Sequence, residues 1–523
     1  MSQKEDLILV YDLGTTGCKV VAFTPKGRVV ASHYEKLKTY QRHPTWVEQK
    51  PEEWKAAIRK GTKILLKEKK ITPNQIKCIS ISGTQMGAVP VNDKGRPLRE
   101  YTIMHFDYRS SAQAKKLIEN MSGFDNFYKI HGLGHPPENL SICKVMWIKD
   151  SERKIYEDAY KFLQSKDFIA LYLTQRFVTD YTDASNTGWL NIERREYSED
   201  ILEAAGIDVE KLPEIHDSHD IIGYVTKKAS RETGLKMGTP VAIGAGDTPA
   251  TCLGAGIIKE GVCYSYIGGA NWNGVCSTKP ILDPLIRMIN LCHPIPGKYN
   301  VFSFTPSGGI IQDWFVDSFY RREGTAERNM YSKDSFGIMN QEISKTSLGA
   351  LGLICLPYLR GGGGPHWNPN ARGAFLGVSI LHKRRHFLRA SLEGVAFSFR
   401  WVMEQTEKAG FPVLKWRELR VVGGGAKNKY WLKIYSDVLG MKLSVLENPQ
   451  EVTSLGAAIA AAVGVGFHKD YEASVKEMVR ISTIILPNLK STKIYDEIYG
   501  IYKEAFHTLT PIFEKIAHIQ SHL

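Results

Sequence analysis

The chain of 523 residues is too long for a single hydrophobic core, so we expect at least two domains. Its 43% hydrophobic and 24% charged residues are typical of a globular protein and exclude a disordered or fibrous one. The net charge of +13 is spread along the chain without a basic helix or an aromatic-interleaved stripe, so nucleic-acid binding is not indicated.

Cysteine usage and hydropathy indicate the compartment. The eight cysteines are scattered and form no C-x-x-C pair, which argues against a zinc cluster or a disulfide framework. The first residues, MSQKED, are charged and do not resemble a signal peptide. The longest weakly polar run, residues 456–466, is too short to span a bilayer. We therefore expect a soluble cytoplasmic protein without a membrane partner.

The N-terminal region predicts a strand, a glycine turn and further strands. LILVYD, residues 7–12, is a continuous apolar run suited to a central strand, and KVVAFT, residues 19–24, follows the turn. RVVASHYEK, residues 28–36, returns as a third strand after a Pro-Lys-Gly turn. An amphipathic helix over 51–69 begins with proline and two acids, and IKCISISG, residues 76–83, is another buried strand.

The second half of the chain repeats this order of elements. Just before the repeat, a strand ends at Asp247, and a helix follows with Thr248 as its predicted N-cap. Residues 261–279 then read as strand, glycine turn and strand, residues 299–309 as a third strand, and residues 418–440 as strand, glycine turn and helix. The repetition suggests an internal duplication with a boundary near residue 256 and a ligand site in the cleft between the halves.

The first glycine turn has the chemistry of an anion site but not a familiar nucleotide fingerprint. The Walker and Rossmann patterns require a helix after the turn, whereas this turn leads into a strand. Anion binding would come from backbone N–H groups, hydroxyls and one cation. These groups belong to Gly14, Thr15, Thr16, Gly17 and Lys19. An ordinary hairpin, with Asp12 and the glycines chosen for turn geometry, explains the stretch equally well.

A second acid at a strand end favours catalysis. Asp247 ends a buried strand, where ligands of open α/β sheets gather, although a plain helix cap is its alternative role. Phosphoryl transfer needs one acid for the metal, which Asp12 could hold through water, and one for the substrate proton. A positioned base contributes roughly 10²–10⁴-fold, and alignment and charge neutralisation supply the rest.

These segments resemble the FGGY family of sugar and polyol kinases, and the resemblance covers nearly the whole chain. DLGTTGCKV resembles the first phosphate loop, GAGDTPATCLGAG the segment of the catalytic aspartate, and SYIGGANWNG the second phosphate loop. SGGIIQDWF and VVGGGAKNKYW resemble the nucleotide-binding and adenosine-binding segments. The resemblance implies an α/β, two-domain actin-like or hexokinase-like ATPase fold, with duplicated ribonuclease H-like domains and a cleft between them.

The resemblance also implies the domains and the reaction. Residues 1–256 would carry the first phosphate loop, the sugar pocket and the catalytic aspartate, and residues 257–523 the second phosphate loop and the adenosine site. ATP and Mg²⁺ would bind with the phosphates between the two loops. Asp12 would support the metal through water, and Asp247 would contact the metal and deprotonate the sugar hydroxyl that attacks the γ-phosphate. Domain closure would exclude water.

The nucleotide-binding residues implied by the resemblance lie in both halves. They are Gly14, Thr15, Thr16, Gly17, Lys19, Gly268, Gly269, Gly308, Gln312, Gly424, Gly425 and Asn428. The implied substrate-binding residues are Gln85, Met86, His105, Asp107, Asp247 and Thr248. Dimers are common among relatives, so a homodimer is the assembly to test, although the sequence marks no interface.

Residues 83–110 indicate the acceptor. Gln85 and Met86 resemble the Gln-Met pair of xylulose kinases, whereas glycerol kinases carry Arg-Glu after the glutamine. Gly87 stands where xylulose kinases have histidine and His105 where they have tryptophan. Gly268-Gly269-Ala270 replaces a Gly-Thr-Ser loop and loses its hydroxyl donors. We expect D-xylulose or a related ketose; ribulose, gluconate, a tetritol and glycerol remain alternatives, as does a non-metabolic ATPase of the same fold.

Overall fold

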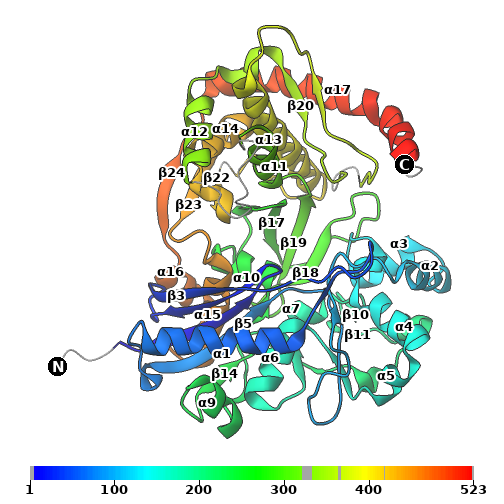
Figure 1. Cartoon of the computed structure of the whole chain (residues 1–523), viewed down its shortest axis with the longest axis vertical. Coiled ribbons are helices and arrows are strands. Elements are labelled where there is room, and N and C mark those ends of the chain that lie inside the picture. Colours follow the sequence, from blue (N-terminus) through cyan, green and yellow to red (C-terminus); the bar gives the residue numbers. More distant parts are fainter. Residues whose placement is uncertain (1–4, 321–332, 363–366, 417, 521–523) are drawn as a thin grey trace. The chain divides into compact units, whose positions relative to one another are not determined.

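The computed structural model describes residues 5–320, 333–362, 367–416 and 418–520, which form two compact units (Figure 1). Each unit is assembled from three separate segments of the chain. Unit 1 consists of Met1–Lys259, Cys276–Val301 and Glu451–Val479. Unit 2 consists of Glu260–Val275, Phe302–Gln450 and Arg480–Leu523.

Unit 1 is built on a mixed β-sheet. Its strands are β1 (Leu7–Leu13), β2 (Gly17–Phe23), β3 (Val29–Lys36), β5 (Ile76–Gly83), β13 (Ile221–Tyr224), β14 (Pro240–Ala242) and β15 (Ala245–Gly246). They lie in the order β13-β14-β5-β1-β2-β3, and β15 also pairs with β5. β1 is antiparallel to β2 and parallel to β5, and all of its residues are buried, as its apolar sequence predicts.

Short strands and helices complete unit 1. The strands are β4 (Glu48–Gln49), β6 (Val89–Val91), β7 (Thr102–Ile103), β8 (Lys161–Leu163), β9 (Val178–Asp180), β10 (Leu190–Asn191), β11 (Glu196–Tyr197), β12 (Glu214–His216) and β18 (Ile289–Cys292). The helices are α1 (Pro51–Lys67), α2 (Ser111–Asn120), α3 (Phe124–His131), α4 (Ser141–Ser151), α5 (Arg153–Asp158), α6 (Ser165–Thr174), α7 (Tyr181–Ala184), α8 (Glu199–Ala205), α9 (Lys227–Thr233), α10 (Asp247–Gly254), α15 (Val452–Gly464) and α16 (Tyr471–Met478).

Helices cover both faces of the unit 1 sheet, and this decides where Asp12 points. Tyr11 belongs to the apolar cluster that includes Trp54 of α1, whereas Val10 belongs to the cluster formed with α10 and α15. Because successive residues of a strand face opposite sides, Asp12 lies on the same side as Val10. The final residues of β1 therefore present a carboxylate toward α15.

The strand predicted before Asp247 is interrupted. It consists of β14 and β15, which are separated at Gly244, a residue with φ of +75°. A Cβ at Gly244 would lie 1.9 Å from the carbonyl oxygen of Ile81, so the close approach of the two backbones requires glycine. The bend lets the chain pair with β5 twice before α10 begins.

Unit 2 repeats the order of strands. Its strands are β16 (Cys263–Ile267), β17 (Asn271–Ser277), β19 (Tyr299–Thr305), β20 (Ile354–Leu356), β21 (Ala374–Leu376), β22 (Glu418–Val422), β23 (Lys442–Leu446) and β24 (Ile481–Ile485). The main sheet runs β19-β17-β16-β22-β23-β24, with β16 antiparallel to β17 and parallel to β22. The helices are α11 (Ile310–Phe319), α12 (Lys333–Ser344), α13 (Arg384–Lys408), α14 (Lys429–Leu439) and α17 (Leu489–Gln520).

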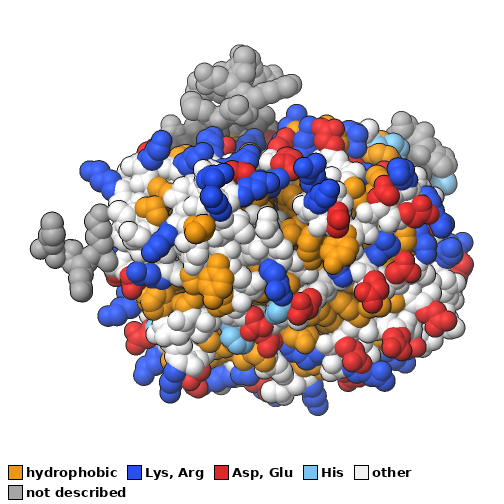
Figure 2. Space-filling model, turned by 90° about the horizontal axis from the view of Figure 1, so that it is seen from below, with side chains coloured by type: hydrophobic (Ala, Val, Ile, Leu, Met, Phe, Trp, Pro, Cys, Tyr) orange, Lys and Arg blue, Asp and Glu red, His pale blue; other side chains and the backbone are white. Residues whose placement is uncertain are grey.

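The structure also shows the distribution of surface charge, the hydropathy of the helices and the state of the cysteines. On the face shown in Figure 2, basic and acidic side chains are interspersed rather than segregated. Among the helices in the described ranges, none combines the length and the apolar character needed to cross a bilayer. None of the eight cysteines, all of which lie in the described ranges, forms a disulfide, and all eight are buried.

Candidate active site

The sheet of unit 1 brings the two predicted acids to the same edge. Leu13 and Gly246 both pair with Gly83 of the central strand β5, so β1 and β15 end side by side with it. Asp12 lies one residue before that level and Asp247 one residue after it. Carboxyl ends of parallel strands are where open α/β sheets place ligands. The geometry therefore gathers both acids where a ligand is expected.

The helix that carries Asp247 begins two residues earlier than predicted. Gly246 is the N-cap and Asp247 the first residue of α10, so the prediction of Thr248 as N-cap is wrong. The carboxylate Oδ1 of Asp247 accepts hydrogen bonds from the backbone N–H of Thr248 at 2.7 Å and from its hydroxyl at 3.2 Å. Oδ2 accepts none from the described residues. Asp247 therefore has one oriented oxygen and one available oxygen.

The surroundings of the two acids raise both pKa values. Burial, followed by the charge of Asp12, raises the pKa of Asp247 to about 7. Burial also raises the pKa of Asp12, against the lowering effects of Lys19, Ser454 and Ser82. The hydroxyl of Ser454, on α15, donates to Asp12 Oδ2 at 3.3 Å. A carboxylate whose pKa lies near neutral pH is suited to accept a hydroxyl proton.

The donor set at this edge suits Mg²⁺ held together with a substrate. The described residues include no group of three or more His, Cys, Asp or Glu side chains that could hold a metal. Mg²⁺ commonly uses one or two carboxylates with waters and substrate phosphates. Asp12 and Asp247 are such a pair, and a cation beside them would relieve the repulsion that raises the pKa of Asp247. The residues present thus fit the metal.

The predicted first phosphate loop is the turn between β1 and β2. The backbone N–H of Gly14 donates to the carbonyl oxygen of Gly17 at 2.9 Å, which closes the turn. Neither glycine has a positive φ. A Cβ at Gly17 would lie 2.3 Å from the ring of Tyr34, so glycine is required there by the packing of that ring. Thr16 is exposed at the tip of the turn.

The polar side chains of this loop have partners within unit 1. The hydroxyl of Thr15 lies 3.2 Å from Nε2 of His105, which joins the phosphate loop to the sugar segment. Tyr34 donates to the hydroxyl of Thr16 at 3.2 Å. Lys19 pairs with Glu451 at 3.5 Å, and in the antiparallel register it stands opposite Asp12. A phosphate bound here would therefore find hydroxyls and an ammonium group that are already oriented.

Gln85 lies against the backbone that precedes Asp247. Its Nε2 donates to the carbonyl oxygen of Thr182 at 2.9 Å, and its Oε1 accepts from Asn186 at 3.1 Å. A Cβ at Gly246 would lie 2.2 Å from that Nε2. The amide thus packs directly under the main chain at Gly246. Its predicted contact with the sugar stays a prediction.

Asp107 also has partners of its own. Its carboxylate accepts two hydrogen bonds from the guanidinium of Arg109, each of 2.8 Å, and one from the backbone N–H of Val47 at 2.6 Å. The guanidinium of Arg109 also forms an ion pair with Glu48, at 2.8 Å between Nη2 and Oε1, and the side chains of Asp107, Arg109 and Glu48 are all buried. A direct contact between Asp107 and a sugar would require exchange of one of these bonds, so this role also stays a prediction.

Met86 and His105, the remaining predicted residues of the sugar segment, lie near a buried lysine, Lys144. Lys144, on α4, donates to the carbonyl oxygens of Met86 and Asn139, both at 2.6 Å, and Met86 has a φ of +61°. Burial lowers the pKa of Lys144 to about 7, and burial together with the charge of Lys144 lowers the pKa of His105 to about 4. His135 has a pKa lowered to about 4 by burial and by the same lysine. His105 and His135 are therefore neutral at pH 7.

Sequence reasoning missed Lys144, His135 and Ser454 as members of this region. Lys144 had a local signal, because it is a lysine inside the apolar stretch SICKVMWI. His135 had no distinguishing pattern. Ser454 is hundreds of residues from Asp12 in sequence, and its contact depends on the packing of α15 in unit 1.

Unit 2 gathers the predicted nucleotide-binding glycines at one edge of its sheet. The turn after β16 contains Gly268 and Gly269, and the backbone N–H of Gly309 donates to the carbonyl oxygen of Gly268 at 2.5 Å. A Cβ at Gly308 would lie 2.6 Å from the carbonyl oxygen of Gly269. The turn with Gly268 and Gly269 and the turn with Gly308 are therefore in direct contact, and their shared nucleotide role stays a prediction.

The predicted adenosine turn meets the same edge because β22 is parallel to β16. Gly423 has a φ of +90°, and a Cβ there would lie 2.7 Å from the carbonyl oxygen of Ile267. This glycine, which sequence reasoning did not select, shapes the turn. A Cβ at Gly425 would meet the side chain of Ile267 at 2.3 Å, whereas one at Gly424 would lie 3.7 Å from Nε2 of Gln450, an ordinary contact. Asn428 caps α14 by accepting from the N–H groups of Tyr430 and Trp431.

Two buried amides at this edge have atoms without a partner. The Nε2 of Gln312, on α11, and the Oδ1 of Asn271, at the start of β17, form no hydrogen bond in the described part of unit 2. Buried amide groups without partners are rare, and each calls for a missing ligand or water. Their position beside the glycine turns fits a polar ligand such as a nucleotide.

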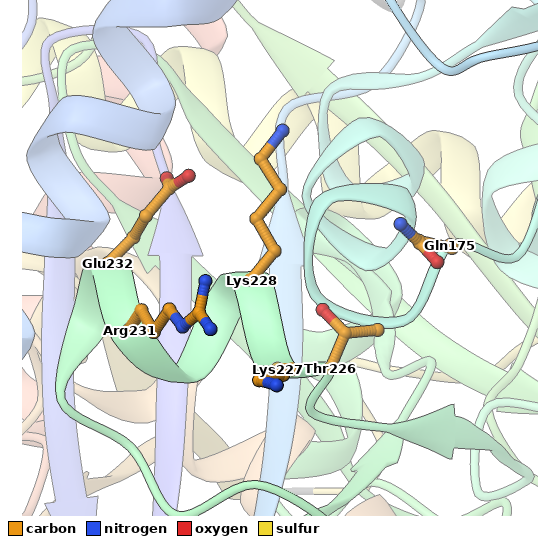
Figure 3. Close-up of a pocket in the computed structure, with 6 residues that line it drawn as sticks. All are labelled: Gln175, Thr226, Lys227, Lys228, Arg231 and Glu232. Carbon is orange, nitrogen blue, oxygen red and sulfur yellow. The ribbon is translucent and has the colours of Figure 1, made fainter.

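A surface hollow of unit 1 lies apart from these residues. It has a volume of about 490 Å³ and is lined by Gln175, Thr226, Lys227, Lys228, Arg231 and Glu232 (Figure 3). Most of these side chains come from α9, and Glu232 is paired with Arg59 at 3.1 Å. None of the predicted site residues lines it. The strand ends, rather than this hollow, are the candidate site.

Comparison with known proteins identifies relatives of both halves. The FGGY family of carbohydrate kinases, N-terminal domain, matches residues 7–254, and the C-terminal domain of that family matches residues 281–465. Xylulose kinase of Staphylococcus epidermidis is 31% identical over 506 residues, which cover 96% of this chain and 97% of the relative. Gluconokinase of Bacillus subtilis is 29% identical over 515 residues, with 98% and 96% covered.

A solved structure shares the fold. The ligand-bound xylulose kinase of Lactobacillus acidophilus superimposes with a TM-score of 0.87 at 22% identity, covering 98% of this chain and 100% of that one. Together with the two domain matches, this confirms the predicted α/β, two-domain fold of the actin-like ATPase type.

Proposed function

The chain belongs to the FGGY family of carbohydrate kinases, and from this premise we propose that it phosphorylates a ketose, with D-xylulose as the best-supported acceptor and D-xylulose 5-phosphate as the product. Membership of the family makes it a phosphotransferase with an alcohol acceptor and ATP as the donor. The acceptor, the Mg²⁺ requirement and the residue roles belong to the proposal.

The observation that carries the proposal is the pair of carboxylates, Asp12 and Asp247, at the carboxyl ends of two strands of the unit 1 sheet. Asp247 has an available oxygen and a pKa raised to about 7, so it would accept the proton of the sugar hydroxyl. Asp12, held by Ser454 and facing Lys19, would support the metal through water. A bound Mg²⁺ would neutralise charge on the transferred phosphoryl group.

The remaining predicted residues have assigned parts in the proposal. The first loop would hold phosphate oxygens through its N–H groups, the hydroxyls of Thr15 and Thr16 and the ammonium of Lys19. The turns of unit 2 would hold the rest of the nucleotide. We retain residues 1–256 as the part that carries the base and the sugar segment, and residues 257–523 as the part that carries the second loop. We place the reaction in the cytoplasm and take a homodimer as the assembly to test.

D-gluconate is the second candidate acceptor, and one feature favours it. Lys144 is a buried lysine that contacts the carbonyl oxygen of Met86 within the sugar segment. A carboxylate on the substrate would be attracted to that ammonium group, whereas a ketose would use it only as a hydrogen-bond donor. A gluconokinase is also among the relatives of similar identity and coverage.

A panel assay of ADP production tests the proposal. The purified protein would be given Mg-ATP with D-xylulose, D-ribulose, D-gluconate, erythritol or glycerol, with a sugar-free reaction as the control. We expect the highest kcat/KM with D-xylulose. A clear preference for D-gluconate would replace the acceptor and leave the kinase reaction standing. ADP production that is independent of every sugar would contradict the proposal and favour a non-metabolic ATPase.

A further inference from the structure

A buried charged cluster lies behind the main chain that carries Asp247. Lys166, on α6, is surrounded by three aspartates: its Nζ lies 2.9 Å from Asp167, 3.1 Å from Asp180 and 3.3 Å from Asp183. All four side chains are fully buried. Burying charged groups is expensive unless they are paired and hydrogen-bonded, and a single lysine cannot neutralise three carboxylates. Because burying this cluster costs free energy of folding, we look for a functional role for it.

The cluster continues toward the active site through one hydroxyl. Asp180 Oδ2 accepts hydrogen bonds from the hydroxyl of Thr182 at 2.6 Å and from the hydroxyl of Ser218 at 2.7 Å. Since the single proton of Thr182 Oγ1 is donated to Asp180, this oxygen is left to accept. It accepts from the backbone N–H of Gly246 at 2.8 Å. Hydrogen bonds to a charged acceptor are shorter and stronger than neutral ones.

The same residue of the main chain is fixed from a second side. The amide of Gln85 donates to the carbonyl oxygen of Thr182, and it packs under Gly246 so closely that a Cβ there would lie 2.2 Å from its Nε2 and 2.8 Å from Asp183 Oδ1. Gly246 is therefore held by a hydrogen bond on its N–H and by contact on its Cα. Gly246 is also the N-cap of α10 and the direct neighbour of Asp247.

We propose that Thr182, held by Asp180 and Lys166, is a positioning residue for Asp247. The chain Lys166–Asp180–Thr182–Gly246 fixes the backbone where α10 starts, and so fixes where the available oxygen of Asp247 lies relative to the sugar hydroxyl. This inference rests on the proposed role of Asp247 as the base. It also gives Gln85 a function that needs no contact with the sugar, since its amide supports both Thr182 and Gly246.

Two substitutions of Thr182 separate positioning from folding. Thr182→Val keeps the shape and removes the hydroxyl, and Thr182→Ser keeps the hydroxyl. Because a misplacement of about 1 Å can cost about 100-fold in rate, we expect Thr182→Val to lower kcat about 10- to 100-fold. KM for the sugar and for ATP should stay within about twofold, because no substrate contact is lost. Thr182→Ser should retain most of the wild-type kcat.

Thr233 provides a matched control in the same unit. It is equally buried, its hydroxyl donates to the carbonyl oxygen of Ala229 at 2.7 Å, and its Oγ1 accepts from the backbone N–H of Leu235 at 3.2 Å. Thr233→Val should lower the melting temperature to a similar extent and leave kcat unchanged. Equal effects of Thr182→Val and Thr233→Val on kcat would overturn the proposal.

A second variant covers the case in which Thr182→Val does not fold. Ser218→Ala removes one hydrogen bond from Asp180 without touching Thr182, and we expect a smaller fall in kcat with KM unchanged; an unchanged kcat would overturn the proposal. The wild-type protein is assayed first with the sugar panel. Absence of sugar-dependent ADP production in the wild type refutes the proposed function, whereas an intact kcat in the variants refutes only the positioning role.

Discussion

At the scale of single residues, two aspartates at one sheet edge differ in what surrounds them. Asp12 faces Lys19 across the β1–β2 pair and accepts a hydrogen bond from Ser454, so its charge is partly offset inside unit 1 although burial still raises its pKa. Among the described residues, Asp247 accepts hydrogen bonds only from the backbone N–H and the hydroxyl of Thr248, both on one carboxylate oxygen. Environment rather than residue type therefore assigns the roles, with Asp12 toward the metal and Asp247 toward the proton.

Asp247→Asn removes the proposed base while keeping the size of the side chain. We expect sugar-dependent ADP production to fall at least about 100-fold, because a positioned base contributes roughly 10²–10⁴-fold. Binding of ATP, measured by calorimetry, should change only a few-fold. Asp125→Asn, which alters an exposed acid in the first turn of α3, is the control and should keep wild-type activity. Substantial kinase activity in Asp247→Asn would rule out the role.

Lys144 should make stability depend on pH in the alkaline range. Burial lowers its pKa from 10.5 to about 7, so the unfolded chain binds more protons than the folded chain between those values. The free energy of unfolding should therefore rise with pH in that window, by up to about 1.4 kcal/mol per pH unit from this one group. Below pH 7 the contribution is constant, because both states hold the proton.

The measurement compares urea unfolding of the wild type and Lys144→Met at pH 7, 8 and 9. The substitution leaves the carbonyl oxygens of Met86 and Asn139 without their donor, so lower stability is expected throughout. The informative quantity is the slope with pH, which should be shallower in Lys144→Met. Lys149→Met, on the same helix but partly exposed, should keep the wild-type slope. Parallel slopes in all three proteins would contradict the prediction.

At the scale of elements, the contact between α10 and α15 positions the surroundings of both Asp12 and Asp247, because α10 carries Asp247 and α15 carries Ser454, which donates to Asp12. The two helices approach so closely that a Cβ at Gly254 would lie 1.9 Å from the carbonyl oxygen of Val452, and one at Gly456 would lie 1.8 Å from that of Ala250. The hydroxyls of Thr251 and Thr453 are 2.8 Å apart across the same contact. Glycine at these positions lets α15 bring Ser454 to Asp12.

Gly456→Ala should separate the two helices. The new Cβ meets backbone atoms that cannot rotate away, so we expect a loss of about 1–3 kcal/mol in the free energy of unfolding. Activity should fall as well, because Ser454 moves with α15. Gly500→Ala is the matched control: Gly500 is exposed in the interior of α17 with open space around its Cα, and alanine there should stabilise by roughly 0.5–1 kcal/mol. Chemical denaturation of both variants checks the opposite signs.

Local sequence patterns predicted the strand–turn–strand hairpins and the positions of Asp12 and Asp247 near strand ends. An apolar run followed by glycine indicates the end of a strand, whichever strand it pairs with in the fold. The start of the helix at Pro51 and the strand–turn–strand units at both ends of the duplication are confirmed. The partners of Gln85 could not be predicted, since Thr182 and Asn186 are about a hundred residues further along the chain. A side chain's partner depends on the fold, whereas its tendency to be buried is local.

At the scale of the whole molecule, the two sheets share one order of strands. The order β3-β2-β1-β5-β14 in unit 1 corresponds to β19-β17-β16-β22-β23 in unit 2, and in each order the third strand is antiparallel to the second and parallel to the fourth. The internal duplication suggested by the sequence is therefore present in the topology. Each copy has a glycine turn between its first two strands.

Unit 1 nevertheless requires a late segment of the chain. Ile8, Val10 and Phe23 share an apolar cluster with residues 455–462 of α15. A fragment of residues 1–259 should consequently expose that face, bind a hydrophobic dye and unfold without cooperativity. Adding residues 451–479 as a peptide should reduce dye binding and restore protection of the β1 amides in hydrogen exchange. Cooperative unfolding of the fragment by itself would contradict the prediction.

The place of α15 in unit 1 also has a consequence for synthesis. At about 5–20 residues per second, a ribosome needs on the order of 20–90 s to proceed from the first strand to this helix. Throughout that interval the nascent sheet has one apolar face without its native cover. Unit 1 therefore cannot be completed until the ribosome has synthesised α15. Slowing elongation before codon 451 should lengthen the time for which holdase chaperones stay bound to the growing chain.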